Sequence, residues 1–511
     1  MKPKNFYITT PIYYPSGSPH IGHAYSSIIA DVFARFKRND NFNVHFLTGT
    51  DEHGLKIQKA AEENKMDTLL YCNKISEIFK NLSKSLNLSN DDFIRTTENR
   101  HHVAVKNIWE KLVLSGDIYL SKYKGWYSVS DEAYYNSDEI SEKNDKKIST
   151  FSGSSVEWVE EESFFFKLSA WQDKLLKFYD DNQKFILPLT RRNEVINFVK
   201  SGLKDLSISR TSFTWGIKVP NNKKHIIYVW LDALTNYLSA INYPNTNDNL
   251  YKKFWPASLH VIGKDILRFH AIYWPAFLLA ANIEPPKRIF SHGWILSGDE
   301  KMSKSKGNIL NPADLIEIYG VDQVRYYLMK EVSHGSDGNI SLKSLENCIN
   351  SDLANNYGNL CQRIFSFIEN NCNNTVKKSG DLSKSDKKLE NETRALTQNL
   401  RSEMNDQNLN NYLKSVINIS FLTNKYINDE EPWKLKKNNI SKMNNILHTS
   451  LKQIAKISIL LNPIIPISTA KVLNALNITH DLINNSFLDE GEILKDIIKT
   501  KHLDILFKKI I

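Results

Sequence analysis

Two histidines, His20 and His23, stand one helical turn apart on either side of Gly22. Imidazole N–H groups at this spacing can donate to phosphoryl oxygens, and glycine leaves room for the flat face of adenine beside the backbone. A helix that begins here would add its unpaired N–H groups and the positive end of its dipole, which favour phosphate. Alone, the segment is weak evidence, because histidines at a helix start are often caps or core residues.

A second polar segment, Lys301-Met302-Ser303-Lys304-Ser305, lies in a stretch without apolar periodicity. Two lysines beside small hydroxyl residues can close on departing phosphates and neutralise charge while the α-phosphate is attacked. Most short lysine clusters are simply solvated loops. The occurrence of both segments in one chain, in this order, argues against that simpler interpretation.

The histidine segment is expected at the start of a parallel sheet. Residues 6–10 are β-branched and aromatic, and the Pro/Gly/Ser stretch after them ends a strand. From Ile21 to Phe36, apolar residues recur at steps of three and four, which predicts a helix packed on a sheet. A buried strand at 44–48 follows, so this order predicts a βαβ unit.

Later segments predict that the sheet is interrupted and then resumed. Apolar runs at 226–231 and 259–262 are each followed by helical periodicity, so we expect both to be strands. Residues 113–225, called the insert below, lie before them and contain short aromatic strands. From Leu345 the pattern is helical, with an exposed connection at 373–388 and a last helical run at 493–511.

Composition limits the possible classes of protein. A chain of 511 residues suggests two to four domains, and 41% hydrophobic residues exclude a disordered protein. The formal charge of +9 favours polyanionic partners, although lysine-rich composition alone gives the same excess. No apolar run approaches the roughly 20 residues that span a bilayer, and no signal-peptide core is present, so we expect a cytoplasmic protein without a membrane partner.

Together, the two polar segments resemble the HIGH and KMSKS signatures of class I aminoacyl-tRNA synthetases. From Phe6 to the region of Trp433, further segments are similar to methionyl-tRNA synthetases, namely residues 9–14, 48–54, 228–234, 263–266 and 291–294. The resemblance implies an α/β fold, with a Rossmann-type parallel-sheet catalytic domain, an inserted connective domain and an α-helical anticodon-binding bundle. The implied domains are the two catalytic halves (1–112 and 226–290), the insert (113–225), a KMSKS-loop and stem-contact region (291–344) and the anticodon-binding domain (345–511).

The resemblance also implies a reaction, in which L-methionine and ATP form methionyl-adenylate and pyrophosphate. Methionine then passes to the terminal adenosine of tRNA(Met), both initiator and elongator. The methionine carboxylate is already ionised and needs no general base, so catalysis is positioning and charge stabilisation. Mg²⁺ would enter with ATP. The implied ATP-binding residues are His20, Gly22, His23, Gly263, Asp265, Lys301 and Lys304, of which the two histidines and two lysines are catalytic.

A methionine pocket follows from the same resemblance, with Asp51 paired to the α-ammonium group. An aromatic wall suits a thioether, since each S–aromatic contact contributes up to about 1.5 kcal/mol. A hydrogen bond from a tyrosine hydroxyl or from His270 would add discrimination against leucine. We expect Trp230 and Tyr237 at the carboxyl end of a sheet strand, where ligands bind in open α/β folds. The implied pocket residues are Ile12, Tyr14, Asp51, Trp230, Ala233, Leu234, Tyr237, Ile266 and His270.

The insert departs from the family pattern at its metal site. Many relatives carry zinc-binding cysteine pairs there, whereas this chain has Ser128 and Asp131, and its four cysteines never form Cys-x-x-Cys. Serine is a poor zinc ligand, so we expect no structural zinc and no metal-binding residues. The insert is also too short for the editing domain of valyl-, isoleucyl- and leucyl-tRNA synthetases.

Three residues of the helical region match the family's anticodon-binding positions: Asn359, Arg363 and Trp433. The first two stand four residues apart, which places them on one helix face, and Trp433 offers a stacking surface for a base. Without the family match, a surface polar pair and a partly buried tryptophan would be the simpler explanation. The expected partner is tRNA(Met), and we expect a monomer because the family's usual dimerisation module does not follow.

Three other functions stay open on the sequence. They are another class I synthetase, a small nucleotidyltransferase-like enzyme that shares the His20 to His23 site without using tRNA, and a non-catalytic tRNA-binding descendant. The helical C-terminal third argues against the second. The intact lysine segment with both histidines argues against the third.

Overall fold

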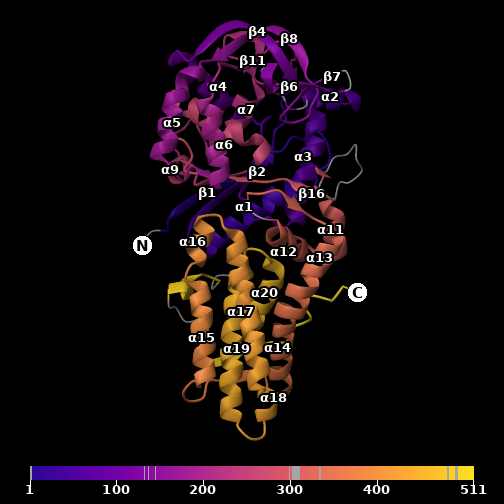
Figure 1. Ribbon diagram of the computed structural model, residues 1–511, viewed down its shortest axis with the longest axis vertical. Coiled ribbons are helices and arrows are strands. Elements are labelled where there is room, and N and C mark those ends of the chain that lie inside the picture. Colours follow the sequence, from indigo (N-terminus) through magenta and orange to yellow (C-terminus); the bar gives the residue numbers. More distant parts are fainter. Residues whose placement is uncertain are drawn as a thin grey trace.

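The computed structural model places an α/β half at one end of an elongated molecule and a helix bundle at the other (Figure 1). It describes residues 3–129, 131, 133–135, 137–143, 146–297, 300–301, 311–332, 335–479, 483–489 and 493–510. Within these ranges, no helix is both long and apolar enough to cross a bilayer.

Six parallel strands form the main sheet. Their order is β3 (Asp92–Arg95), β2 (Asn43–Thr50), β1 (Asn5–Thr9), β14 (Leu259–Gly263), β15 (Ile289–His292) and β9 (Ile186–Leu187). Helix α1 (Ile21–Asn39) connects β1 to the neighbouring β2. The predicted βαβ unit and parallel sheet are confirmed.

The side chains of these strands belong alternately to two separate hydrophobic cores, one on each face of the sheet. Ile8 and Phe46 belong to the core that contains α1, whereas their neighbours Tyr7 and Leu47 belong to the core on the opposite face. Successive side chains of a strand point to opposite faces, so a sheet covered on both sides reads as a nearly continuous apolar run. The second core is built with α4 (Asn99–Leu114), α10 (Trp274–Ala280) and part of the insert.

Residues 226–231 are not a strand of the main sheet, and that prediction was wrong. β13 (Asn222–Ile227) pairs with β11 (Ser209–Arg210) and β12 (Lys218–Val219), and residues 229–234 form helix α7 (Val229–Leu234). A short apolar run fits a buried helix as well as a strand, which is why periodicity misassigned it. The run at 259–262 does form a strand, β14, beside β1.

The insert is built around a long antiparallel ribbon of β4 (Ile118–Ser128) and β8 (Glu157–Phe166), far from the helix bundle (Figure 1). β5 (Ala133–Tyr135) and β10 (Leu206–Ser207) complete its sheet, and β6 (Ile140–Lys143) and β7 (Lys146–Ser149) form a hairpin. The chain reaches β9 through α5 (Gln172–Asp181) and leaves it through α6 (Leu189–Lys200), so the main sheet already contains a strand from within residues 113–225.

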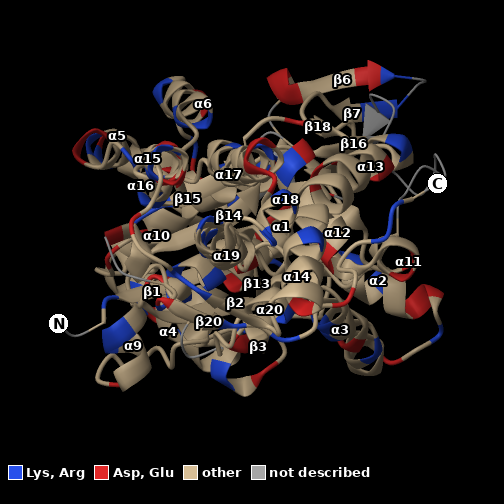
Figure 2. Ribbon diagram, turned by 90° about the horizontal axis from the view of Figure 1, so that it is seen from below, with Lys and Arg blue, Asp and Glu red and all other residues tan. Residues whose placement is uncertain are grey.

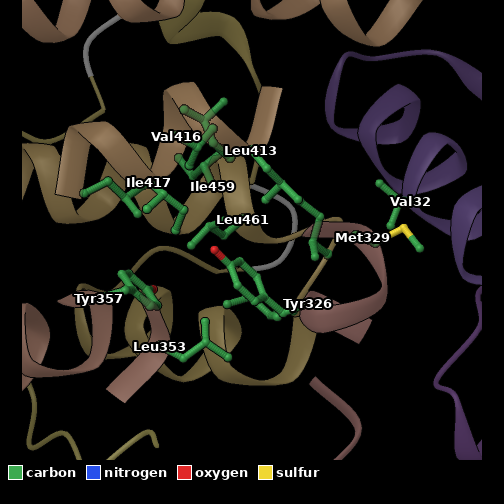
Figure 3. Packing of buried hydrophobic residues seen from close by; sticks show 14 of the residues in the cluster. Val32, Tyr326, Met329, Leu353, Tyr357, Leu413, Val416, Ile417, Ile459 and Leu461 are labelled. Carbon is green, nitrogen blue, oxygen red and sulfur yellow. The ribbon is translucent and has the colours of Figure 1, made fainter. Parts of the chain in front are cut away.

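The helix bundle packs directly against α1. One apolar cluster runs from Val32 on α1 through Met329 to Leu413 and Leu461 of the bundle (Figure 3). The main helices are α12 (Val321–Glu331), α14 (Asn359–Asn371), α15 (Lys384–Thr397), α17 (Leu409–Glu430) and α19 (Ile440–Leu461). The shorter helices around them are α11 (Pro312–Tyr319), α13 (Leu342–Cys348), α16 (Leu400–Asn405), α18 (Pro432–Leu435) and α20 (Pro466–Ala475).

A buried arginine reinforces this contact. The guanidinium of Arg325 on α12 is 2.6 Å from the carboxylate of Asp31 on α1, and both side chains are fully buried. It also donates to the carbonyl oxygens of Leu86, Pro463 and Ile464. The charge is therefore paired and hydrogen-bonded, as burial requires.

Two predictions for the helical region were wrong. The connection at 373–388 contains β19 (Thr375–Lys377) and the start of α15, and residues 493–510 contain β20 (Ile497–Lys499) instead of a helix. The two strands pair with each other, Val376 opposite Ile498. β-Branched residues favour strands, and only a partner distant in sequence reveals this pairing.

Candidate functional site

A cavity of about 1200 Å³ opens at the carboxyl ends of the central strands. It contains the residues that follow β1 and β2, the end of β14 and the start of α1, as expected for an open α/β sheet. The sequence-predicted residues that line it are Ile12, Tyr14, His20, Gly22, His23, Asp51, Trp230, Ala233, Leu234, Tyr237, Gly263, Asp265, Ile266 and His270.

The histidine segment caps α1 at the cavity. Nδ1 of His20 accepts from the backbone N–H of Gly22 at 3.1 Å, and Nδ1 of His23 accepts from that of His20 at 3.0 Å. Each neutral ring then carries its proton on Nε2, which makes Nε2 a donor. A Cβ on Gly22 would lie 2.9 Å from Cε1 of His20, so glycine is needed for this cap.

Gly263 and Asp265 lie at and just after the end of β14 and line the same cavity as the histidines. A Cβ on Gly263 would lie 2.6 Å from the Asp265 carboxylate, which accepts from the indole N–H of Trp294 at 3.3 Å. Trp294 also lies under the ammonium of Lys264, 4.0 Å from the ring centroid. Trp294 is part of the segment 291–294 that resembles the family, but no role was assigned to it from the sequence.

His292 is a second cavity residue that sequence reasoning left without a role. Its Nδ1 donates to the Gly293 carbonyl at 2.8 Å, so Nε2 accepts from the hydroxyl of Ser26 on α1 at 2.7 Å. Burial lowers the pKa of His292, which keeps the ring neutral. His292 therefore joins the end of β15 to the first turns of α1, beside the histidine segment.

The aromatic wall comes from helices, not from a strand end as predicted. Trp230 lies on α7 and Tyr237 on α8 (Asn236–Ser239). Trp230 stacks on Phe269, with centroids 3.7 Å apart and planes 5° apart, and Tyr237 stacks on His260 at 4.1 Å. The flat, polarizable faces suit an unbranched thioether.

His270 and Tyr237 hydrogen-bond to each other at this wall. Nδ1 of His270 is 3.0 Å from the Ile266 carbonyl and donates to it, so Nε2 accepts from the Tyr237 hydroxyl at 2.7 Å. Burial lowers the pKa of His270 to about 4, which keeps it neutral. In this arrangement neither side chain has a proton left to donate to a thioether.

Asp51 stands at the end of β2 with only 4% of its surface exposed. Its Oδ1 atom has no hydrogen-bond partner among the described residues. Burial raises the pKa of Asp51 well above its usual range, and the nearby carboxylate of Asp232 raises it further. A buried carboxylate oxygen without a partner, at the wall of a cavity, fits a cationic ligand group.

Asp232 lies between two imidazoles beneath this site. Its oxygens are 2.7 Å from Nδ1 of His53 and 2.7 Å from Nε2 of His101. Although burial favours the protonated acid, these imidazoles hold the pKa of Asp232 well below its usual range. Asp232 therefore stays ionised and adds negative potential near Asp51. In the sequence, Asp232 was noted only as part of the segment 228–234 that resembles the family, without a role of its own.

The lysine segment lies largely outside the described residues. Of Lys301, only the backbone is described, in β17 (Glu300–Lys301), which pairs with β16 (Ile295–Ser297). Lys304 is outside the described residues. The contribution of both lysines remains a prediction.

The metal-site positions of the insert form a hydrogen-bonded cluster. The Asp131 carboxylate accepts from the hydroxyls of Tyr135 and Ser154, each at 2.8 Å, and of Ser152. The Asp131 backbone N–H is 3.3 Å from Oγ of Ser128. Among the residues that the structure describes, no group of three or more His, Cys, Asp or Glu side chains could hold a metal ion.

A smaller cavity of about 280 Å³ lies in the helix bundle and brings two predicted residues together. The Arg363 guanidinium lies 5.5 Å from the ring centroid of Trp433, whose side chain is 37% exposed. Asn359 is exposed one turn earlier on the same helix, α14. Basic and acidic segments are interspersed when the molecule is viewed from this end, so charge alone does not mark a binding face (Figure 2).

Comparisons with known proteins agree over nearly the whole chain. Residues 6–144 and 141–365 match the model of the class I tRNA synthetases (M), and residues 376–511 match that of the anticodon binding domain of methionyl tRNA ligase. A methionine–tRNA ligase of Rickettsia typhi is 52% identical over 93% of this chain and 94% of its own. One of Rhizobium meliloti is 49% identical over 95% of this chain and 94% of its own.

Solved structures give the same result. Methionyl-tRNA synthetase of Mycobacterium tuberculosis, in complex with methionyl-adenylate, has a TM-score of 0.95 and 42% identity, and the match covers 99% of both chains. The apo form of that protein has a TM-score of 0.88 and 39% identity, and this match covers 99% of this chain and 98% of the other.

Proposed function

Because this chain belongs to the methionyl-tRNA synthetases of class I, we propose that it joins L-methionine to both initiator and elongator tRNA(Met). Methionine and ATP would first form methionyl-adenylate and pyrophosphate, and the methionyl group would then pass to the terminal adenosine of the tRNA. The observation that carries the proposal is a carboxylate oxygen of Asp51 that finds no hydrogen-bond partner in the described part of the chain, inside the cavity that the aromatic wall lines. An α-amino acid with an apolar, polarizable side chain satisfies both features.

Positioning explains the first step. Asp51 pairs with the α-ammonium group, and the faces of Trp230 and Tyr237 hold the thioether side chain. The methionine carboxylate then attacks the α-phosphate directly, because it is ionised and needs no base. His20 and His23 donate to the phosphates from the start of α1, where the helix dipole also favours negative charge.

The remaining predicted residues complete the nucleotide site. Gly263 and Asp265 bind the adenosine part, and Lys301 and Lys304 neutralise charge that develops toward pyrophosphate. Mg²⁺ would enter with ATP, held by its phosphates more than by protein side chains. Asn359, Arg363 and Trp433 bind the anticodon, and we propose a cytoplasmic monomer.

Methionine alone is expected to support efficient ATP–pyrophosphate exchange when all twenty amino acids are compared. Homocysteine lacks only the terminal methyl group, so its exchange should be weaker by roughly 1–3 kcal/mol, or about 10- to 200-fold in kcat/KM. Stronger exchange with valine, isoleucine or cysteine would reject the proposed specificity.

The purified protein is expected to contain no stoichiometric zinc. Ser128 and Asp131 replace thiolates, and Asp131 is already engaged by the hydroxyls of Tyr135, Ser152 and Ser154. Elemental analysis should give well below one zinc per chain, and exchange activity should survive a chelator once free Mg²⁺ is restored. One bound zinc, with activity lost on its removal, would contradict this expectation.

A further inference from the structure

Stacking fixes the orientation of Trp230 at the aromatic wall. Its indole N–H has no hydrogen-bond partner among the described residues, whereas its ring lies flat on Phe269 at 3.7 Å. Both rings line the large cavity. The position of Phe269 therefore decides which face Trp230 presents to a ligand.

Phe269 is in turn held by the insert tip, defined here as the described residues from 131 to 156. The ring of Phe269 packs against Tyr135 and Val156, which form a small core of their own in this tip. No other element of the catalytic half reaches that core through an apolar residue among those described. The insert tip thus contacts the aromatic wall at Phe269, although more than one hundred residues separate Phe269 from the tip in sequence.

Arg268, the neighbour of Phe269, anchors the same contact through charge. Its guanidinium is 3.1 Å from a carboxylate oxygen of Glu139 in the insert tip. The guanidinium also lies 4.0 Å from the ring centroid of Phe198 and 5.0 Å from that of Phe151. Flanking rings shield the half-buried pair from water, which makes it stronger than an ordinary surface salt bridge.

Asp131 makes the insert tip a single unit. It joins Tyr135, on one side of the β6–β7 hairpin, to Ser152 and Ser154 on the other side. These hydrogen bonds close the loop around Asp131, one of the two positions at which the family resemblance would place a thiolate ligand. The part of the insert that contacts the aromatic wall is therefore a loop held together by side-chain hydrogen bonds.

We propose that the insert tip is a positioning element for methionine, in which the Arg268–Glu139 pair fixes Phe269 and, through it, the plane of Trp230. This inference rests on the function proposed above. Arg268 and Glu139 act through Phe269 and are positioning residues. Methionine binding is expected to depend on this pair more strongly than ATP binding does, because the rings that the pair orients belong to the proposed methionine wall.

Charge reversal and restoration test the inference. Glu139→Arg and Arg268→Glu are each expected to raise KM for methionine about tenfold, within the range of coupling between contacting residues. KM for ATP and kcat should change less than about twofold, because the pair acts on Phe269 and Trp230, which are assigned to methionine. The double variant, which exchanges the two charges, should bring KM for methionine back to within about threefold of the wild type.

A matched control uses another ion pair of the same tip. Glu142 and Lys147 form an exposed pair within the β6–β7 hairpin, 2.6 Å apart. Glu142→Arg should leave KM for methionine unchanged. If charge reversal lowers the melting temperature, the milder Glu139→Gln variant is used to test the inference instead. Glu139→Gln should raise KM for methionine about threefold.

Two results would overturn the inference. The first is an unchanged KM for methionine in both single variants. The second is an equal rise in KM for methionine and KM for ATP that the double variant does not reverse. Absence of methionine-dependent exchange in the wild-type protein would instead reject the proposed function, so the two failures are distinguishable.

Discussion

Asp51→Asn is expected to lower kcat/KM for methionine in pyrophosphate exchange by roughly 10³-fold, while KM for ATP stays nearly unchanged. Removing one charge of a buried, hydrogen-bonded pair costs about 2–5 kcal/mol, because the other charge is left desolvated and unpaired. Asp51 is 4% exposed, so water cannot replace it. Exchange rates measured across methionine and ATP concentrations separate the two effects.

The pH dependence of the wild-type protein checks the same assignment. Protonated Asp51 is neutral and cannot pair with an ammonium group, and burial raises its pKa well above the usual range. Methionine affinity should therefore fall, as pH decreases, well before pH reaches the ordinary carboxyl value of roughly 3.9. Binding should also release a proton, because the ammonium group favours the ionised carboxylate. Calorimetry in buffers of different ionisation enthalpy measures that release.

An isosteric control separates this effect from a general loss of structure. Asp67 caps α3 (Thr68–Ser85), where asparagine serves equally well, so Asp67→Asn should leave the kinetics unchanged. A native KM for methionine in Asp51→Asn, or the same pH dependence as in the wild type, would remove Asp51 from the ammonium site.

Trp433→Ala is expected to lower kcat/KM for tRNA charging by about 5- to 150-fold, since stacking on an aromatic side chain contributes roughly 1–3 kcal/mol per base. Methionine-dependent exchange should change less than about twofold. α18, which carries Trp433, lies at the end of the bundle away from the sheet (Figure 1). Charging and exchange, measured on one preparation, give the two values.

Phe421→Ala is the matched control, because Phe421 is another exposed aromatic residue of the bundle, on α17. It should leave charging unchanged, and Trp433→Phe should retain part of the stacking. An equal loss of charging and exchange in Trp433→Ala, with a lower melting temperature, would make Trp433 a core residue instead.

The sequence predicted three of the six strands of the central sheet, β1, β2 and β14, and many of the residues that line the cavity. The strands of a parallel sheet end at one edge, so the motifs that follow residues 10, 48 and 262 lie near one another there. Asp51, Gly263 and the start of α1 accordingly line one cavity. This rule needs only the order of elements. It does not require knowledge of which side chains touch.

Other site features could not be predicted because they depend on contacts distant in sequence. Asp232 acquires its role only when His53 and His101 fold against it, and Phe269 acquires its role from the insert tip. Periodicity also failed at residues 226–231, where a buried helix and a buried strand have the same composition. The neighbouring sequence of such a residue does not reveal which distant residues it will contact.

The apolar cluster beneath the sheet, which continues from α1 into the bundle, makes the two halves of the enzyme thermodynamically interdependent. α1 begins beside His20 and His23, which we propose bind the nucleotide, and its far side is covered by helices of the C-terminal half. Cutting the chain near residue 345 would expose this cluster and remove the carbonyl oxygens of Pro463 and Ile464 that accept from the buried Arg325. Unfolding is therefore expected to be cooperative across both halves, and the proposed phosphate site at the start of α1 depends on packing by the proposed anticodon-binding helices.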